Sequence, residues 1–267
     1  MGLFDVHAHL THPHLIEDID RVLERARAAG LSTIISNGLN PDDNAAVLAL
    51  AEKSPLVRPA LGLYPVDAVL EEMLAAGETY PGQRKAWPTR VAVDWVREHV
   101  SLAFAVGEIG LDGHWVPERF WPAQEAAFRE LVQIAMDAGK AIIIHTRKRE
   151  RRTLELLDEL GATRVNWHCF TSRLNLAREI ASRGHYLSIP ANVRRSQTFT
   201  AMLGGLPRDR LLLETDSPYL GPDKEAHNEP ANVKGTVEFA AELWGTSETQ
   251  AANQLAQNFE ALFGTAP

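Results

Sequence analysis

Short apolar runs alternate with longer amphipathic segments along the whole chain. Eight of these runs are rich in Val, Ile and Leu and have the length of buried strands: 3–8, 31–36, 57–63, 102–109, 140–145, 163–168, 185–189 and 210–215. Between them, apolar residues recur at helical spacing, as in EDIDRVLERARAAG (17–30) and PAQEAAFRELVQIAMDAG (122–139), and both segments end at a glycine. The pattern predicts strands and helices in regular alternation.

Eight strands alternating with helices in 267 residues predict an α/β protein, a parallel (β/α)₈ barrel of the TIM type. A doubly wound open sheet is the alternative, although no GxGxxG motif follows the first apolar run. Residues 66–90 form a long insertion after the third strand, either a lid or binding loop or a surface elaboration. Because no linker or repeat divides the chain, we expect residues 1–267 to form a single domain.

The composition is that of an ordinary globular protein, with 45% hydrophobic and 23% charged residues. No apolar run approaches the roughly 18 residues that a membrane helix needs, and the first residues lack the pattern of a secretory signal. The single cysteine, Cys169, excludes an internal disulfide and is more typical of a packing residue than of a nucleophile. We therefore expect a cytoplasmic protein without membrane association, and no feature indicates an obligate protein partner.

Residues of metal-ligand type stand at the carboxyl ends of the predicted strands, where the active sites of such barrels lie. His7 and His9 are spaced i, i+2, so in a strand their side chains point the same way. The complete set is His7, His9, Glu108, His145, His168 and Asp216. His12 and His14 lie on loop or helix positions and are not counted, although they resemble ligands in type.

Four imidazoles and two carboxylates exceed what one metal ion requires, but they suit two ions that share a bridging carboxylate. Two ions about 3.5–4 Å apart can hold a hydroxide between them and stabilise the entering and leaving oxygens of a displacement. The predicted chemistry is hydrolysis. Four nitrogen ligands favour zinc, with magnesium, manganese, nickel or iron as alternatives for a mixed nitrogen and oxygen set.

Several motifs, in this order along nearly the whole chain, resemble those of the TatD family of metal-dependent deoxyribonucleases. They are HAHL (7–10), GEIGLD (107–112), QExxF (124–128), HTR (145–147), HCF (168–170), ETDSPYL (214–220) and NEP (228–230). The resemblance implies a barrel of the amidohydrolase type with a divalent-metal site and phosphoester hydrolysis.

The resemblance also implies roles for single residues. It places His7, His9 and Asp216 on one metal and His145 and His168 on a second, with Glu108 as the bridge. Asp216 and Glu108 are the catalytic residues on this interpretation, and Asp216 is the candidate general base for the water that attacks.

The chain departs from the family pattern near the expected substrate. Tyr64 stands where the family usually has the histidine of Gly-x-His-Pro, so a phenol that cannot carry positive charge near neutral pH replaces an imidazole. Lys148 replaces an aspartate after HTR, and residues 188–196 lack the usual Ser-Gly run. These departures leave the ligand set complete and affect the substrate.

The formal charge of −8 argues against an extended nucleic-acid surface, but RKRERR (147–152) provides a local basic run beside His145. We expect an anion clamp in which Arg147 binds a phosphate bidentately and Lys148, Arg149 and Arg151 add weaker attraction. A solvated charged turn is the alternative. Other candidates on the same rim are Arg194 and Arg195 as an extension of the clamp, and Trp115 as a base-stacking or loop-anchoring residue.

These observations favour a phosphodiesterase of the exonuclease type, with DNA ends or short single-stranded nucleic acid as substrate. The alternative is a hydrolase of acyl esters or amides, such as an aminoacyl-tRNA deacylase or a lactonase-like amidohydrolase, because the same ligand set serves both reactions. A barrel that only binds metal is disfavoured because the full ligand set is present.

Overall fold

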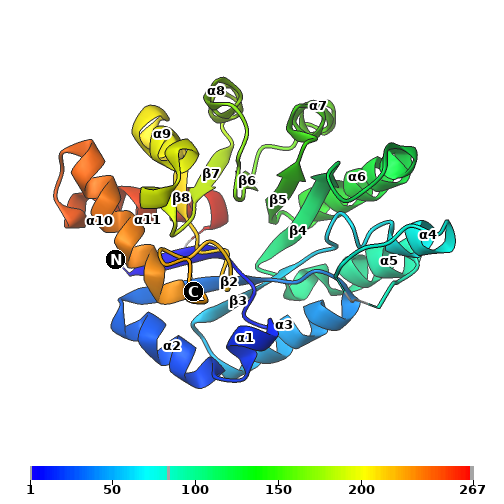
Figure 1. Cartoon of the computed structure of the whole chain (residues 1–267), viewed down its shortest axis with the longest axis horizontal. Coiled ribbons are helices and arrows are strands. Elements are labelled where there is room, and N and C mark those ends of the chain that lie inside the picture. Colours follow the sequence, from blue (N-terminus) through cyan, green and yellow to red (C-terminus); the bar gives the residue numbers. More distant parts are fainter. Residues whose placement is uncertain (1, 83–84, 265–267) are drawn as a thin grey trace.

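The computed structural model describes residues 2–82 and 85–264, with the strands at the centre of a ring of helices (Figure 1). Within these residues eight strands form one parallel sheet, in the order β1 to β8. They are β1 (Leu3–Ala8), β2 (Leu31–Asn37), β3 (Val57–Leu61), β4 (Ala105–Asp112), β5 (Ala141–Arg147), β6 (Val165–Trp167), β7 (Tyr186–Ile189) and β8 (Leu211–Leu213). The predicted (β/α)₈ barrel is confirmed.

At least one α-helix follows each of the eight strands, and the helices form the outer layer. They are α1 (Pro13–Ile16), α2 (Ile19–Ala28), α3 (Pro41–Lys53), α4 (Leu70–Ala75), α5 (Thr89–His99), α6 (Trp121–Asp137), α7 (Glu150–Leu160), α8 (Leu174–Ser182), α9 (Gln197–Gly205), α10 (Val233–Trp244) and α11 (Glu248–Phe263). Short 3₁₀ turns occupy Val100–Leu102, Glu118–Phe120, Val193–Arg195, Arg208–Arg210 and Pro230–Asn232. Within the described ranges, no helix is long and apolar enough to span a bilayer.

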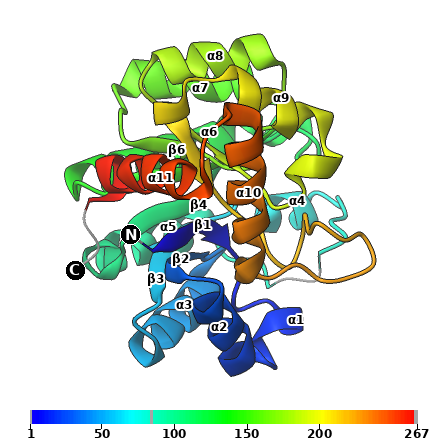
Figure 2. The same cartoon turned by 90° about the vertical axis from the view of Figure 1, so that its left-hand side faces the viewer.

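The segment that follows β8 closes the barrel, because it forms hydrogen bonds with the end of β1. Ser217 forms a parallel bridge with Ala8, and the amide of His9 donates to the carbonyl of Ser217 at 2.9 Å. The amide of Asp216 donates to the carbonyl of His7 at 2.8 Å. The two last helices, α10 and α11, pack beside β1 on the same side (Figure 2). This closure, absent from an open doubly wound sheet, brings the loop after β8 against the end of β1.

The fourth strand differs most from its prediction. It begins at Ala105, because Leu102 belongs to a 3₁₀ turn, and it continues through GLD to Asp112. Gly110 permits this extension: its φ is +152°, and a Cβ there would lie 1.8 Å from the carbonyl oxygen of His145. The two backbones therefore approach closely enough for β4 and β5 to remain paired as far as Arg147.

Two hydrophobic clusters support the barrel. The large one fills the sheet interior and the space between sheet and helices. A second, smaller cluster lies beneath the segment after β3, where Val66, Leu70 and Met73 pack against Val116 and Phe120 from the β4–α6 connection. The described part of residues 66–90 thus contains α4 and is anchored on its own apolar contacts. Its role as a lid or as a surface elaboration stays a prediction.

Candidate metal centre

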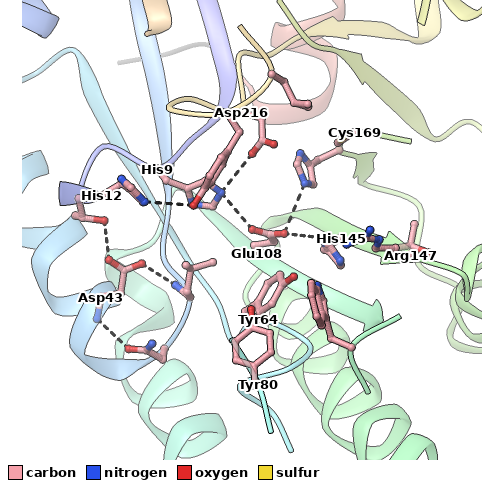
Figure 3. A pocket seen from close by; sticks show the side chains of 18 of the residues that line it. His9, His12, Asp43, Tyr64, Tyr80, Glu108, His145, Arg147, Cys169 and Asp216 are labelled. Atoms are coloured by element: carbon pink, nitrogen blue, oxygen red, sulfur yellow. Dashed lines mark hydrogen bonds and ion pairs between the residues drawn. The ribbon is translucent and has the colours of Figure 1, made fainter. Parts of the chain in front are cut away.

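The carboxyl ends of five strands direct their polar side chains to one cavity of about 800 Å³. His9 follows from β1, Glu108 and His145 from β4 and β5, and Asp216 from the loop after β8 (Figure 3). His168, directly after β6, also lines the cavity, and His7 lies fully buried behind it. The structure therefore brings together all six residues that the sequence singles out.

Glu108 stands between two groups of histidines. Its Oε2 lies 3.4 Å from the Nε2 of His7 and 3.6 Å from the Nε2 of His9. Its Oε1 lies 2.9 Å from the Nδ1 of His145 and 3.6 Å from the Nε2 of His168. One carboxylate thus presents one oxygen to each group, as a bridging ligand would.

Asp216 completes the first group. Its Oδ1 lies 3.4 Å from the Nε2 of His9 and 3.7 Å from the Nε2 of His7. The backbone φ of Asp216 is +55°, in the left-handed region that a non-glycine residue adopts at a cost of about 1–3 kcal/mol. Such strain persists where surrounding contacts impose it, here the backbone bond to His7.

The donor set fits a divalent cation. Two groups of three residues offer ligand atoms within 4.8 Å of one another, namely His7, His9 and Asp216, and His7, Glu108 and His168. The Nε2 atoms of His7 and His9 face each other at 3.3 Å, and the rings of His7 and His168 stack with centroids 3.6 Å apart. A bound cation would stabilise this close approach of the imidazoles, because it would accept the nitrogen lone pairs.

Burial and neighbouring charges set the protonation of these groups. Burial, reinforced by the charge of His168, lowers the pKa of His7 to about 3, so this imidazole is neutral. Burial alone would raise the pKa of Glu108, but hydrogen bonds from His145 and His7 outweigh it and hold the pKa well below its usual range. Burial would likewise raise the pKa of Asp216, but the charge of His168 and the hydrogen bond to His9 outweigh it and lower that pKa. Both carboxylates are therefore ionised and ready for a cation.

Two acidic residues that sequence reasoning missed hold the second pair of histidines from behind. Asp112 Oδ2 lies 3.1 Å from the Nε2 of His145, which leaves Nδ1 facing Glu108. Glu214 Oε2 lies 3.3 Å from the Nδ1 of His168, which leaves Nε2 facing Glu108. Both lie inside recognised motifs, Asp112 in GEIGLD and Glu214 in ETDSPYL, and this position was the available signal.

A third buried acid, Asp5, connects the first strand, β1, to the segment that follows the last strand, β8. Its Oδ1 accepts from the amide of His7 at 3.1 Å and from the amide of Thr215 at 2.9 Å, and its Oδ2 accepts from the Thr215 hydroxyl. Burial raises the pKa of Asp5 to about 8 despite these bonds. Asp5 fixes β1 against the segment that carries Asp216.

The residues predicted to contact substrate separate into two sets. Arg147 and Tyr64 line the cavity, whereas Lys148, Arg149 and Arg151 are not among its described lining residues. Arg149 is buried, pairs with Glu125 and lies 3.9 Å from the ring centroid of Trp121.

The direction of the chain explains this separation. Lys148 has a φ of +62°, and α7 begins at Glu150, so the chain turns away from the cavity directly after Arg147. Arg151, on the first turn of α7, pairs with Glu179 at 2.6 Å. Most arginines of the basic run therefore form ion pairs with glutamates on neighbouring helices. Of the run, only Arg147 lines the cavity.

Three further candidates are placed by the structure. The partly buried thiol of Cys169 lines the cavity, but desolvation raises its pKa well above the usual range, which disfavours a thiolate nucleophile. His12 also lines the cavity, and its side chain accepts a hydrogen bond from the amide of His14 as the N-cap of α1. Neither His12 nor His14 belongs to the two ligand groups. Trp115 lines the cavity wall.

Comparison with known proteins agrees with this geometry. The model of the TatD related DNase family matches residues 4–264. The deoxyribonuclease TATDN3 of Homo sapiens is 30% identical over 98% of this chain and 95% of its own length. The 3'-5' ssDNA/RNA exonuclease TatD of Cronobacter sakazakii is 32% identical over 91% of this chain and 90% of its own length.

A solved structure shares the whole architecture. The crystal structure of YJJV, a TatD homologue from Escherichia coli, superposes with a TM-score of 0.85 at 25% identity and covers 98% of each chain. The family match over residues 4–264 includes all six candidate ligands, and the similar chains each cover at least 91% of this chain. The chain therefore belongs to the TatD related DNase family and, with it, to the metal-dependent hydrolases.

Proposed function

We propose that this protein hydrolyses phosphodiester bonds at DNA ends or in short single-stranded nucleic acid. The observation that carries the proposal is the position of Glu108, with one oxygen in each of two ligand groups, in a cavity that Arg147 also lines. The similar human and Cronobacter proteins are a deoxyribonuclease and a 3'-5' ssDNA/RNA exonuclease, and this similarity supports the same substrate class.

Two divalent ions per chain would be held by His7, His9 and Asp216 on one side and by His145 and His168 on the other, with Glu108 shared. Zinc suits the four nitrogens, and magnesium, manganese, nickel or iron are the alternatives. When bound, such ions supply Lewis acidity for the phosphoryl oxygen and acidify water.

The protein's own side chains would position the substrate and move the proton. Asp216 has an ionised carboxylate at the cavity surface, with its side chain 13% exposed, so it is the candidate base for the attacking water. Arg147 would hold the phosphate through its planar guanidinium. Tyr64, whose ring centroid lies 4.9 Å from that of His145, would offer its hydroxyl to the same group without adding positive charge.

Replacing Glu108 tests the proposal directly. Glu108→Gln should weaken both ligand groups, because it removes the one negative charge that both share, and cleavage of a single-stranded oligonucleotide should fall at least about 100-fold. Bound metal, measured by elemental analysis, should fall for both ions, whereas His168→Ala should mainly empty one site.

The matched control is Glu179→Gln, an equivalent change at a glutamate paired with Arg151 on the outer helices. It should leave metal content and cleavage unchanged. Two ions retained in Glu108→Gln would contradict the bridging role. Efficient hydrolysis of a neutral or aminoacyl ester, with no cleavage of oligonucleotides, would instead favour acyl chemistry.

A further inference from the structure

The cavity of the metal centre has an aromatic side, which includes Tyr80 and Trp115, and a polar side, which includes Thr11 and Asp43. On the polar side Thr11 donates to Asp43 at 2.6 Å, and Asp43 also caps the amide of Leu39 at 3.0 Å. Tyr64 also lines the cavity, and in the view of Figure 3 both Tyr64 and Tyr80 are drawn below Glu108. The cavity thus offers both polar and aromatic surfaces to a ligand.

The aromatic wall is assembled from separate segments. Tyr80 comes from the long insertion after β3, and Trp115 comes from the β4–α6 connection. Their ring centroids lie 5.7 Å apart at an interplanar angle of 82°, an edge-to-face pair. Both are only partly buried, and both pack against the small cluster formed by Val66, Val69, Leu70, Met73, Val116 and Phe120.

This packing fixes the rings while part of each remains open to the cavity. Aromatic side chains have few rotatable bonds, so a ring held at its back by apolar contacts presents a rigid surface at little further entropic cost. Tyr80 and Trp115 both line the cavity. They therefore form a preformed aromatic surface, with the two ring planes nearly perpendicular, within the same cavity as the ligand set.

A positive charge adjoins this surface. The guanidinium of Arg147 lies 5.8 Å from the ring centroid of Trp115. In the part of the chain that the structure describes, no carboxylate pairs with Arg147, in contrast to Arg149 and Arg151 farther along the run. An aromatic surface next to an uncompensated cation matches the two parts of a nucleotide, a base with a π face and a phosphate.

We propose that Tyr80 and Trp115 form a base-stacking subsite, which holds the base next to the scissile phosphate while Arg147 contacts a phosphate. This inference rests on the proposed phosphodiesterase function and adds a specificity-determining surface to it. It also gives the insertion of residues 66–90 a role, because that segment supplies Tyr80. Recognition by stacking accepts any base, but it requires an unpaired base whose face is open.

The test compares two single strands of the same length and phosphate count, one with natural bases and one with abasic sugars throughout. The metal-loaded wild-type protein should cleave the natural strand with a kcat/KM about 5- to 100-fold higher, the size of one stacked base, mainly through a lower KM. Trp115→Leu and Tyr80→Leu should each bring that ratio close to one while changing kcat/KM for the abasic strand less than about 2-fold.

Two variants separate stacking from a structural role. Trp115→Phe keeps a ring and should retain most of the preference for bases, while the quenching of tryptophan fluorescence by a bound natural strand should diminish. Trp95→Leu alters a partly buried indole that stacks on His99 in α5, outside the cavity, and should leave the ratio unchanged.

Three outcomes would overturn the subsite. Equal kcat/KM for both strands in the wild type would reject it and leave the phosphodiesterase function standing. Equal losses on both strands in the leucine variants would assign the rings a structural role. A wild-type protein that cleaves neither strand would overturn both the function and the subsite.

Discussion

The two histidines that face Oε1 of Glu108, His145 and His168, are each oriented by a carboxylate on the far side of the ring. His145 has Asp112 behind it, and His168 has Glu214, which also accepts from the amide of Cys169 at 2.8 Å and from the Ser188 hydroxyl at 2.6 Å. These bonds select the ring nitrogen that faces Glu108, so they determine the ligand geometry before a metal arrives.

Neutralising these carboxylates should therefore weaken metal binding without removing a ligand. Asp112→Asn and Glu214→Gln are each expected to raise the dissociation constant of one ion by about 10- to 100-fold, the usual scale for partners behind a metal-ligating histidine. Titration of the metal-free protein, followed by calorimetry, measures this. Affinity within 2-fold of wild type in both variants would show that the imidazoles are oriented by packing alone.

Single residues of the site also differ in how far the sequence predicts them. His7, His9 and Glu108 were predictable because position at the carboxyl end of a strand fixes where a side chain points. Asp112 and Glu214 lie inside the motifs, but the motifs do not give their roles, because these depend on which imidazole stands beside each carboxylate after folding. Arg149 illustrates the same limit: its partners Glu125 and Trp121 lie on α6, and nothing in the run RKRERR indicates them.

A histidine that must remain neutral connects β6 with the start of β7. The indole nitrogen of Trp167 can only donate, and it donates to the Nδ1 of His185 at 3.1 Å. The Nε2 of His185 must then carry the proton, which it donates to the carbonyl of Ala162 at 3.0 Å. Burial lowers the pKa of His185 accordingly.

This arrangement predicts an acid-sensitive stability. Below about pH 6.5 the unfolded chain protonates this histidine while the folded chain does not, so the free energy of unfolding should decrease as the pH falls. The contribution is fully present above pH 6.5, and its slope reaches at most about 1.4 kcal/mol per pH unit. Urea unfolding between pH 5 and roughly pH 7.5 tests this. His185→Gln should flatten the decline, whereas His99→Gln on α5 should not, and parallel curves for wild type and His185→Gln would contradict the prediction.

The close approach of the backbones at the end of β3 and in β4 gives another prediction. A Cβ on Gly62, directly after β3, would lie 2.4 Å from the carbonyl carbon of Gly107 and 2.6 Å from the carbonyl oxygen of Glu108. These are backbone atoms of Glu108, the proposed bridging ligand, and of the residue before it, so they cannot swing aside as a flexible side chain would.

Gly62→Ala should therefore displace Glu108. We expect at least about 10-fold lower activity and a loss of roughly 1–3 kcal/mol in unfolding free energy, the usual cost of overpacking. Gly204→Ala provides the matched control, because that helical glycine has no atom within 4 Å of an added Cβ and should be neutral or slightly stabilised. Similar effects in both variants would show that the contact at Gly62 relaxes easily.

For the whole molecule, the pattern of strands predicts the barrel but not how it closes. Eight apolar runs were enough for the order β1 to β8. Closure depends instead on the loop after β8, where Ser217 bridges Ala8 and Thr215 bonds to Asp5 from the other end of the chain. Contacts between residues more than 200 positions apart leave no local periodicity to detect.

Closure of the barrel also brings the candidate metal ligands together from elements that are far apart in the sequence. The six candidate ligands come from β1, β4, β5 and the segments after β6 and β8, so ions bound there would join elements from the whole length of the chain. A ligand that binds only the folded state stabilises it by about 2.7 kcal/mol at a free concentration 100 times its dissociation constant. For a protein of this size that corresponds to a rise in Tm of roughly 5–10 °C.

Removing metal should therefore lower the Tm by about that amount, and adding the same metal back should restore it. Thermal unfolding followed by calorimetry, with and without a chelator, gives the measurement. In Glu108→Gln the difference should shrink, because that variant lacks the charge shared by both ligand groups, whereas Glu179→Gln should behave as wild type. A Tm that chelation leaves unchanged in protein shown to have lost its metal would mean that the barrel holds the six ligands in place unaided, and that bound ions serve the reaction without contributing to the fold.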